Sequence, residues 1–107
     1  MNPRELDVLN ILYKSQEPMM ATDIVNAGEG LTQSTVTAVL RKLLYAKLVE
    51  VVGVTHSGKV LSRTYRPTEK AKALLLQCFV EQYQSFSSVI PLDELIEVLK
   101  GQVAQND

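Results

Sequence analysis

The chain of 107 residues contains one cysteine, one histidine and no tryptophan. A single cysteine cannot form a disulfide within the chain, which is typical of proteins in a reducing compartment, so we predict a cytoplasmic location. Cys78 and His56 are the only soft metal ligands, and a structural zinc site needs about four. We therefore expect neither a metal nor a cofactor.

Long apolar runs and low-complexity segments are also missing. No apolar stretch approaches the roughly 20 residues that a transmembrane helix needs. Residues 1–10 carry acidic side chains where a secretory signal would have an uninterrupted apolar stretch. Hydrophobic residues make up 46% of the chain and charged residues 21%, which is normal for a soluble globular protein of one-domain size. We expect a folded chain that does not associate with membranes.

Acidic residues are almost absent from the middle of the chain. Residues 31–66 contain six basic side chains and one acid, Glu50, whereas the segments on both sides contain more acids than bases. The formal net charge of −1 hides this distribution. A basic segment within an acidic chain predicts an anionic partner that binds on that segment.

The spacing of apolar residues predicts helices at residues 3–15, at about 22–27 and from Thr32 to about residue 46. Two segments rich in β-branched residues then predict a hairpin over residues 49–66, closed by a turn centred on Gly58. A fourth helix is expected from Thr68 to about Phe86, and a last one from near Pro91. This order predicts an α+β, mainly helical fold, a winged helix-turn-helix with a DNA-binding domain at residues 1–67 and a helical dimerisation region at 68–107.

The third predicted helix has an unusual outward face. Gln33, Ser34, Thr37 and Arg41 lie opposite its apolar stripe of Val36, Leu40 and Leu44, and no acid is present. An ordinary helix start would explain Gln33 and Ser34 but not Thr37, one turn further along, where threonine lowers helix propensity. Hydroxyl, amide and guanidinium groups can read base edges, whereas phosphate would repel a carboxylate. The candidate DNA-binding residues of this helix are Thr32, Gln33, Ser34, Thr35, Thr37, Arg41 and Lys42.

The predicted hairpin carries the other basic residues. His56 and Lys59 belong to its polar turn, and Arg63 and Arg66 to its second strand. In isolation this would be an ordinary solvated turn with surface charges. Beside a recognition helix, we predict that these four residues contact DNA phosphates.

The C-terminal helices contain more apolar surface than one small core requires. The fourth helix has one stripe that includes Cys78 and Phe79, with Cys78 expected to be inert core, and a second stripe. The alternative to a partner is a helix enclosed within its own domain. We instead expect a homodimer formed through Leu76, Val80, Tyr83, Leu92, Leu95, Ile96 and Leu99. No paired carboxylates and no adjacent Cys–His pair are evident, so we do not expect an enzyme.

The chain resembles the penicillinase repressors, a family of bacterial winged-helix regulators. The resemblance is in ELxVLxIL at residues 5–12, ATDI at 21–24, STVxxVLxKL at 34–43, and in residues 48–49 and 65–67. It implies a homodimeric repressor that binds double-stranded DNA at a pseudo-palindromic operator, with the C-terminal helices forming the dimer contact.

Two features of that family have no counterpart here. The copper-responsive members carry paired cysteines near the C-terminus, which this chain lacks, and residues 69–107 show no match to the cleavage site of the β-lactam-responsive members. The inducing signal or signalling partner therefore stays open. The isoelectric point of 5.8 favours a second hypothesis, in which the winged helix contacts another protein and does not bind DNA.

Overall fold

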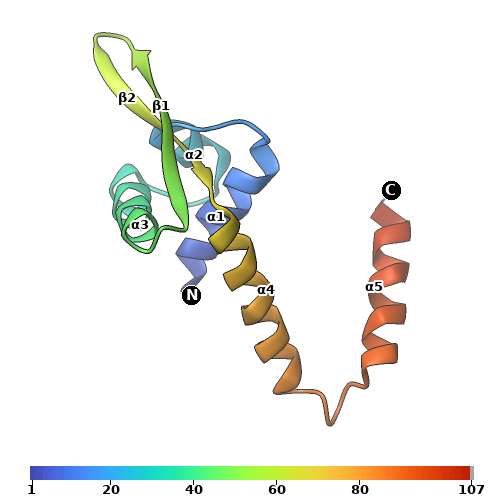
Figure 1. The fold of residues 1–107 in the computed structure, drawn as a ribbon. Coiled ribbons are helices and arrows are strands. Elements are labelled where there is room, and N and C mark those ends of the chain that lie inside the picture. The colour runs from blue at the N-terminus through green and yellow to red at the C-terminus, as the bar shows by residue number, and fades with distance from the viewer. Residues whose placement is uncertain (107) are drawn as a thin grey trace. The chain divides into compact units, whose positions relative to one another are not determined.

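The computed structural model describes residues 1–106. Along the chain (Figure 1) come α1 (Pro3–Ser15), α2 (Ala21–Ala27), α3 (Gln33–Tyr45), β1 (Val49–Ser57), β2 (Val60–Pro67), α4 (Glu69–Gln84) and α5 (Leu92–Asn106). The elements form two compact units, Met1–Leu74 and Leu75–Asp107. The predicted order of three helices, a two-stranded hairpin and two further helices is confirmed, and each boundary lies within two residues of its predicted position.

Helix α1 begins with a reciprocal cap. The side-chain oxygen of Asn2 accepts a hydrogen bond from the backbone N–H of Glu5 at 2.9 Å, and the Glu5 carboxylate accepts one from the backbone N–H of Asn2 at 3.3 Å. Pro3 occupies the first helical position, where its missing N–H would have no partner in any case. The cap fixes the start of the helix that supplies Val8, Leu9 and Leu12 to the core.

Helix α3 is also capped by its own sequence. The Thr32 hydroxyl accepts a hydrogen bond from the backbone N–H of Thr35 at 3.2 Å, as expected for a threonine at the N-cap. The inward face buries Val36, Val39, Leu40 and Leu43. Leu44, which was predicted to belong to this stripe, is only half-buried because it lies at the edge of the buried face.

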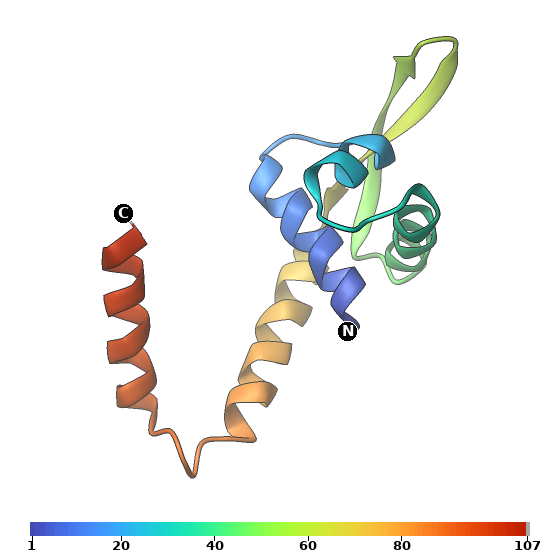
Figure 2. The ribbon, with the colours of Figure 1, turned by 180° about the vertical axis from the view of Figure 1, so that it is seen from behind.

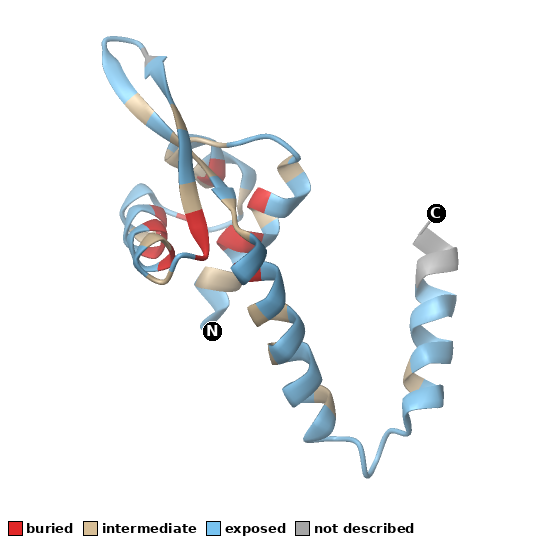
Figure 3. Ribbon diagram, in the orientation of Figure 1, coloured by how far each residue is buried: buried red, intermediate tan, exposed pale blue. Residues whose placement is uncertain are grey.

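The hydrophobic core lies entirely within the unit Met1–Leu74. Figure 3 shows buried residues in α1, α2, α3, at the start of β1 and in the first turn of α4. Ala71 of α4 is fully buried, and the Thr68 hydroxyl just before it donates to the carbonyl of Lys47 at 2.7 Å. The start of α4 is therefore part of the winged-helix core.

The hairpin pairs antiparallel from Val49 with Pro67 to Ser57 with Val60. The register shifts after Val51, so Val52 forms a β-bulge that changes the direction of β1. Gly58 begins the two-residue turn with φ at +66°, a value that favours glycine and suits tight hairpins. In the view of Figure 2 the hairpin extends away from α1, α2 and α3.

In the unit Leu75–Asp107, the apolar residues of α4 and α5 are largely exposed, and no residue from 72 to 102 is buried. One expectation for α4 is wrong. Cys78, predicted to be inert core, is only half-buried, and Phe79 of the same stripe is 65% exposed. Within the described chain no element packs onto this part of α4 with more than marginal contact. The helix ends at Gln84 rather than near Phe86, and turns follow it.

Candidate nucleic-acid interface

The outward face of α3 presents polar side chains in a row. Gln33, Ser34, Thr37 and Arg41 are all exposed, as predicted, and so is Lys42 in the last turn. Because positions four residues apart stack on one face of a helix, Thr37 and Arg41 lie one above the other. The face carries no acidic side chain. An anion can approach it without meeting a carboxylate on the same helix.

Tyr45 extends this face, although it was not among the residues predicted from the sequence. It lies four residues beyond Arg41 and is 91% exposed, the most exposed large apolar side chain in the described chain. The spacing was visible in the sequence, but a tyrosine between leucine and alanine reads as a residue of the apolar stripe. Its exposed phenol hydroxyl is a hydrogen-bond donor that adds to the polar groups of this face.

Three hydroxyls cluster at the beginning of α3. The Thr32 hydroxyl lies 2.9 Å from that of Thr35 and 3.2 Å from that of Ser34. Thr32 caps the helix and Thr35 is half-buried, so both hydroxyls already have partners that hold the helix start in place. Of the three, Ser34 is the one with an exposed position on the face of Thr37 and Arg41.

Helix α3 and the hairpin meet at a small hollow that contains two arginines. A cavity of about 200 Å³ is lined by Ala21, Thr37, Leu40, Arg41, Leu44, Arg63 and Tyr65. Thr37 and Arg41 come from α3 and Arg63 comes from β2. The fold therefore brings together residues that are up to 26 positions apart in the sequence. Both arginines remain exposed. Two arginines that line one hollow favour the binding of an anion there.

The remaining basic residues of the hairpin are distributed along its length. His56 and Lys59 lie at the far end and are exposed. Arg63 is cross-strand to Val54, and Arg66 lies opposite Glu50 at the base, where its Nε donates to Oε1 of Glu50 at 2.6 Å. Of the four predicted residues, Arg63 therefore lies beside α3, and His56 and Lys59 lie at the tip of the hairpin. Arg66 forms an ion pair within the protein.

The base of the hairpin is attached to the loop before α2. The backbone N–H of Met19 donates to the carbonyl of Tyr65 at 3.0 Å, and the backbone N–H of Tyr65 donates to the carbonyl of Met19 at 2.8 Å. Tyr65 is half-buried, as expected of a packing residue. This pairing fixes β2 beside the helices and so fixes where Arg63 lies.

The residues predicted to form a dimer contact are accessible in the single chain. Leu76, Val80, Leu92, Ile96 and Leu99 are exposed, with Leu76 at 63% and Leu92 at 57%. Tyr83 and Leu95 are half-buried, and the Tyr83 hydroxyl donates to the carbonyl of Ile90 at 2.9 Å. That hydrogen bond closes the turn that leads from α4 toward α5.

Residues 1–106 contain no group of three or more His, Cys, Asp or Glu side chains placed to hold a metal ion. Across the same residues, no helix combines the length and the apolarity needed to cross a membrane.

Comparison with known proteins gives the same architecture. No protein-family model matches the chain, and no curated protein matches its sequence. Among solved structures, MepR with the substitution A103V from a multidrug-resistant S. aureus clinical isolate aligns with a TM-score of 0.64 and 23% identity, over 98% of this chain and 75% of that one. A PadR family transcription regulator from Clostridium difficile aligns with a TM-score of 0.60 and 16% identity, over 82% and 94%. BpsR from Bordetella bronchiseptica, whose DNA binding is regulated by 6-hydroxynicotinic acid, aligns with a TM-score of 0.56 and 24% identity, over 100% and 76%.

The chain has the winged helix-turn-helix fold. Helix α3 occupies the place of the recognition helix in that fold, and the β1–β2 hairpin occupies the place of the wing. The predicted fold class is confirmed.

Proposed function

We propose that this protein is a sequence-specific DNA-binding transcription regulator. The observation that supports this most directly is the meeting of Thr37 and Arg41 of the recognition helix with Arg63 of the wing at one exposed hollow. Direct readout needs side chains that reach base edges, and phosphate contacts need cations beside them. The solved structures with this fold support the same proposal, because they include a transcription regulator and BpsR, a protein that binds DNA.

In this proposal the recognition helix enters the major groove and the wing follows the backbone. Gln33, Ser34, Thr37 and Arg41 contact base edges, because amide, hydroxyl and guanidinium groups match the donor and acceptor pattern of the groove. Arg63 contacts phosphate and determines register without reading sequence. Lys42, His56, Lys59 and Arg66 add to the positive potential that attracts DNA.

We further propose that the protein acts as a homodimer on a pseudo-palindromic operator. One winged helix covers only one half-site, and helix-turn-helix dimers place two reading helices about 34–36 Å apart or at a multiple of this spacing. The exposed apolar residues of α4 and α5, including Leu76 and Leu92, are the surface that a second copy would cover. This surface shares no residue with α3 or with the wing.

The resemblance to the penicillinase repressors supports repression as the regulatory outcome. It rests on the motifs within residues 5–67, which include the recognition helix and the end of the wing. The C-terminal helices lie outside those motifs. The assignment to this family and to repression is therefore part of the proposal.

The deciding experiment is selection of bound sequences from a random duplex pool, followed by measurement of affinity against salt concentration. We expect one enriched motif with two related halves. The logarithm of the binding constant should fall linearly with the logarithm of the salt concentration, with a slope of about −0.9 for each phosphate neutralised. A pool that shows no enrichment and no salt-dependent binding would exclude this function.

A second candidate function is contact with another protein through the winged helix. The exposed apolar side chains of the wing, Val54, Val60 and Leu61, each more than 60% exposed, favour it. A wing that only contacts DNA phosphates does not need exposed apolar side chains. The same experiment separates the two functions, because an interaction module without DNA binding would retain no duplex at low salt.

A further inference from the structure

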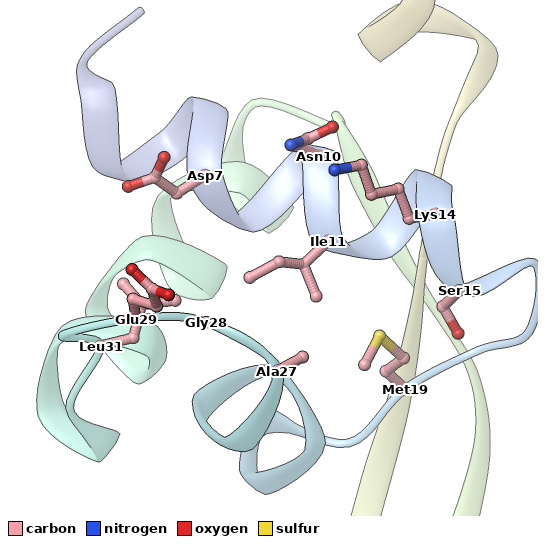
Figure 4. Close-up of a pocket in the computed structure, with 10 residues that line it drawn as sticks. All are labelled: Asp7, Asn10, Ile11, Lys14, Ser15, Met19, Ala27, Gly28, Glu29 and Leu31. Atoms are coloured by element: carbon pink, nitrogen blue, oxygen red, sulfur yellow. The ribbon is translucent and has the colours of Figure 1, made fainter. Parts of the chain in front are cut away.

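We infer that the winged-helix unit contains a binding site for a small zwitterion with an apolar body, and that occupation of this site alters DNA binding. The site is a cavity of about 720 Å³ between α1, the loop before α2 and the turn between α2 and α3 (Figure 4). This volume falls in the range of about 300–1,000 Å³ that is usual for small-molecule sites. The cavity lies within the unit Met1–Leu74 and away from the hollow that contains Arg41 and Arg63.

The lining of the cavity has two charged ends and an apolar middle. Figure 4 shows the carboxylates of Asp7 and Glu29 on one side of Ile11 and the amine of Lys14 on the other. Ile11 and Met19, both half-buried, supply the apolar surface between these ends. A ligand that satisfies both ends must carry a cation and an anion separated by an apolar segment.

Some polar groups of the cavity already have a hydrogen-bond or ion-pair partner within the protein, and others do not. Asp7 pairs with Arg4 at 3.4 Å, and the Ser15 hydroxyl donates to the carbonyl of Glu17 at 2.8 Å. Among the described residues, no side-chain hydrogen bond or ion pair involves Glu29 or Lys14. Glu29 is therefore the carboxylate available to a ligand ammonium, and Lys14 is the cation available to a ligand carboxylate.

The walls of the cavity are the segments that position both DNA-binding elements. Leu31 is buried and directly precedes Thr32, the cap of the recognition helix. Its side chain packs so closely on Gly28 that a Cβ added at Gly28 would lie 2.3 Å from Leu31 Cδ1. A ligand that contacts Leu31 would therefore lie against the residue that directly precedes the cap of the recognition helix.

The opposite wall leads to the wing. Met19 lines the cavity with its side chain, and its backbone exchanges two hydrogen bonds with Tyr65 of β2. Tyr65 in turn lines the hollow beside Arg63 and Arg41. Two backbone hydrogen bonds therefore connect a wall of the cavity to the wing, and a measurement of operator affinity tests whether they couple the two sites.

The binding test uses three probes with the same carbon chain: ε-aminocaproate, hexylamine and hexanoate. Each is titrated into the full chain while backbone amide resonances are recorded, in the absence of DNA. We expect ε-aminocaproate to shift the amides of Ile11, Gly28 and Leu31, and to bind more tightly than either singly charged probe. Equal affinities for the three probes, or shifts confined to other residues, would overturn the assignment.

Charge variants test each end separately. Lys14→Gln should reduce the affinity for ε-aminocaproate about fivefold, the value of one exposed ion pair of about 1 kcal/mol, and leave hexylamine unchanged. Glu29→Gln should reduce the affinity for ε-aminocaproate and for hexylamine, and should leave the affinity for hexanoate unchanged. Glu17→Gln and Lys72→Gln, exposed residues that do not line the cavity, are the matched controls and should change nothing. If the controls weaken binding as much as the cavity variants, binding is nonspecific and the site is wrong.

The regulatory part of the inference rests on the proposed DNA-binding function and is tested separately. Operator affinity is measured by anisotropy with and without saturating ε-aminocaproate, for the parent and for Glu29→Gln. We expect the probe to change the parent's affinity at least threefold and the variant's affinity less. Unchanged parent affinity would exclude the coupling. A chain that binds the probe but no duplex would contradict the proposed function while leaving the binding site intact.

Discussion

Arg66 donates through Nε to Oε1 of Glu50 at 2.6 Å across the base of the wing. Glu50 is the only acid between residues 31 and 66, so the sole negative charge in the basic segment is used to pair one of its six cations. Both side chains are about half exposed, at 59% and 45%, and such pairs add only about 0–1 kcal/mol to stability. In the proposed DNA complex we expect the pair to matter more for DNA binding than for stability, because Glu50 offsets the charge of Arg66.

The first prediction concerns the two wing arginines. Arg63→Ala should flatten the salt dependence of DNA binding by about one unit and weaken all sequences alike. Arg66→Ala should have a smaller effect, because Glu50 already offsets its charge. Glu50→Gln should strengthen binding at low salt by releasing Arg66. Binding isotherms on operator and random duplex over a range of salt concentrations test this, and equal slopes for Arg63→Ala and Arg66→Ala would contradict it.

The second prediction concerns Arg41 of the recognition helix. If Arg41 contacts a guanine, Arg41→Ala should weaken operator binding by about 1–3 kcal/mol and relax the preference at one base position. Random DNA should be affected much less. Lys42→Ala, the neighbouring cation in the same turn, is the control and should weaken operator and random DNA equally. The reader role fails if the selected motif of Arg41→Ala is the same as that of the parent.

The sequence predicted the fold because its elements are determined locally. Asn2 and Thr32 cap their helices, Gly58 turns the hairpin, and each apolar stripe repeats with helical spacing. It predicted Thr37, Arg41 and Arg63 one at a time, but the hollow that joins them depends on how β2 packs beside α3. That packing is fixed in part by the backbone pairing of Met19 with Tyr65. Because this pairing uses only backbone atoms, the side chains in the sequence do not reveal it.

The sequence failed where burial depends on the neighbouring surface. Cys78 and Phe79 lie in the same helical register as the buried Ala71, and this periodicity is why Cys78 was expected to be core. Only Ala71 meets the rest of the winged-helix unit. Periodicity shows which residues share a face of a helix, and it does not show how far along the helix that face is covered.

The third prediction concerns the left-handed backbone of Lys47, which has φ at +62° just after α3. The left-handed conformation destabilises a residue that has a Cβ by about 1–2 kcal/mol, and glycine avoids this steric cost. Glycine loses more backbone entropy on folding, which offsets about 0.5–1 kcal/mol of the gain. Lys47→Gly should therefore raise the free energy of unfolding by about 0.5–1 kcal/mol. The carbonyl that accepts from Thr68 is retained. Urea denaturation measures the change. Lys47→Ala is the control, since it keeps the Cβ and should change stability little.

The fourth prediction concerns Tyr13, whose hydroxyl lies 3.5 Å from the carbonyl of Thr68. Burial raises the pKa of Tyr13 above its ordinary value of 10.0, and the nearby charge of Glu69 adds to the effect. Since the folded state holds this proton more tightly than the unfolded state, the associated stability is present below pH 10 and is lost as pH rises through the folded-state pKa. Tyr13→Phe should show a smaller loss of unfolding free energy than the parent above pH 10. Parallel curves for the two proteins would refute this.

The fifth prediction concerns dimerisation through the unit Leu75–Asp107. Val80 is 47% exposed on α4, and Leu95 is half-buried on α5 beside the exposed Leu92, Ile96 and Leu99. A carboxylate at either position would be buried without a partner in a dimer, which costs several kcal/mol, and would be solvated in a monomer at little cost. Val80→Glu and Leu95→Glu should therefore dissociate the subunits.

The winged-helix unit should survive these changes, because its buried residues end at Ala71. We expect sedimentation to show a dimer for the parent and a monomer for the variants, with helical circular dichroism largely retained. Specific operator binding should fall to the level of nonspecific binding, because one winged helix reaches only one half-site. Lys100→Glu, an exposed charge reversal on α5, is the control for a change of charge alone and should leave the dimer intact. A parent chain that sediments as a monomer at micromolar concentration, both free and on operator DNA, would falsify the dimer and with it the palindromic operator.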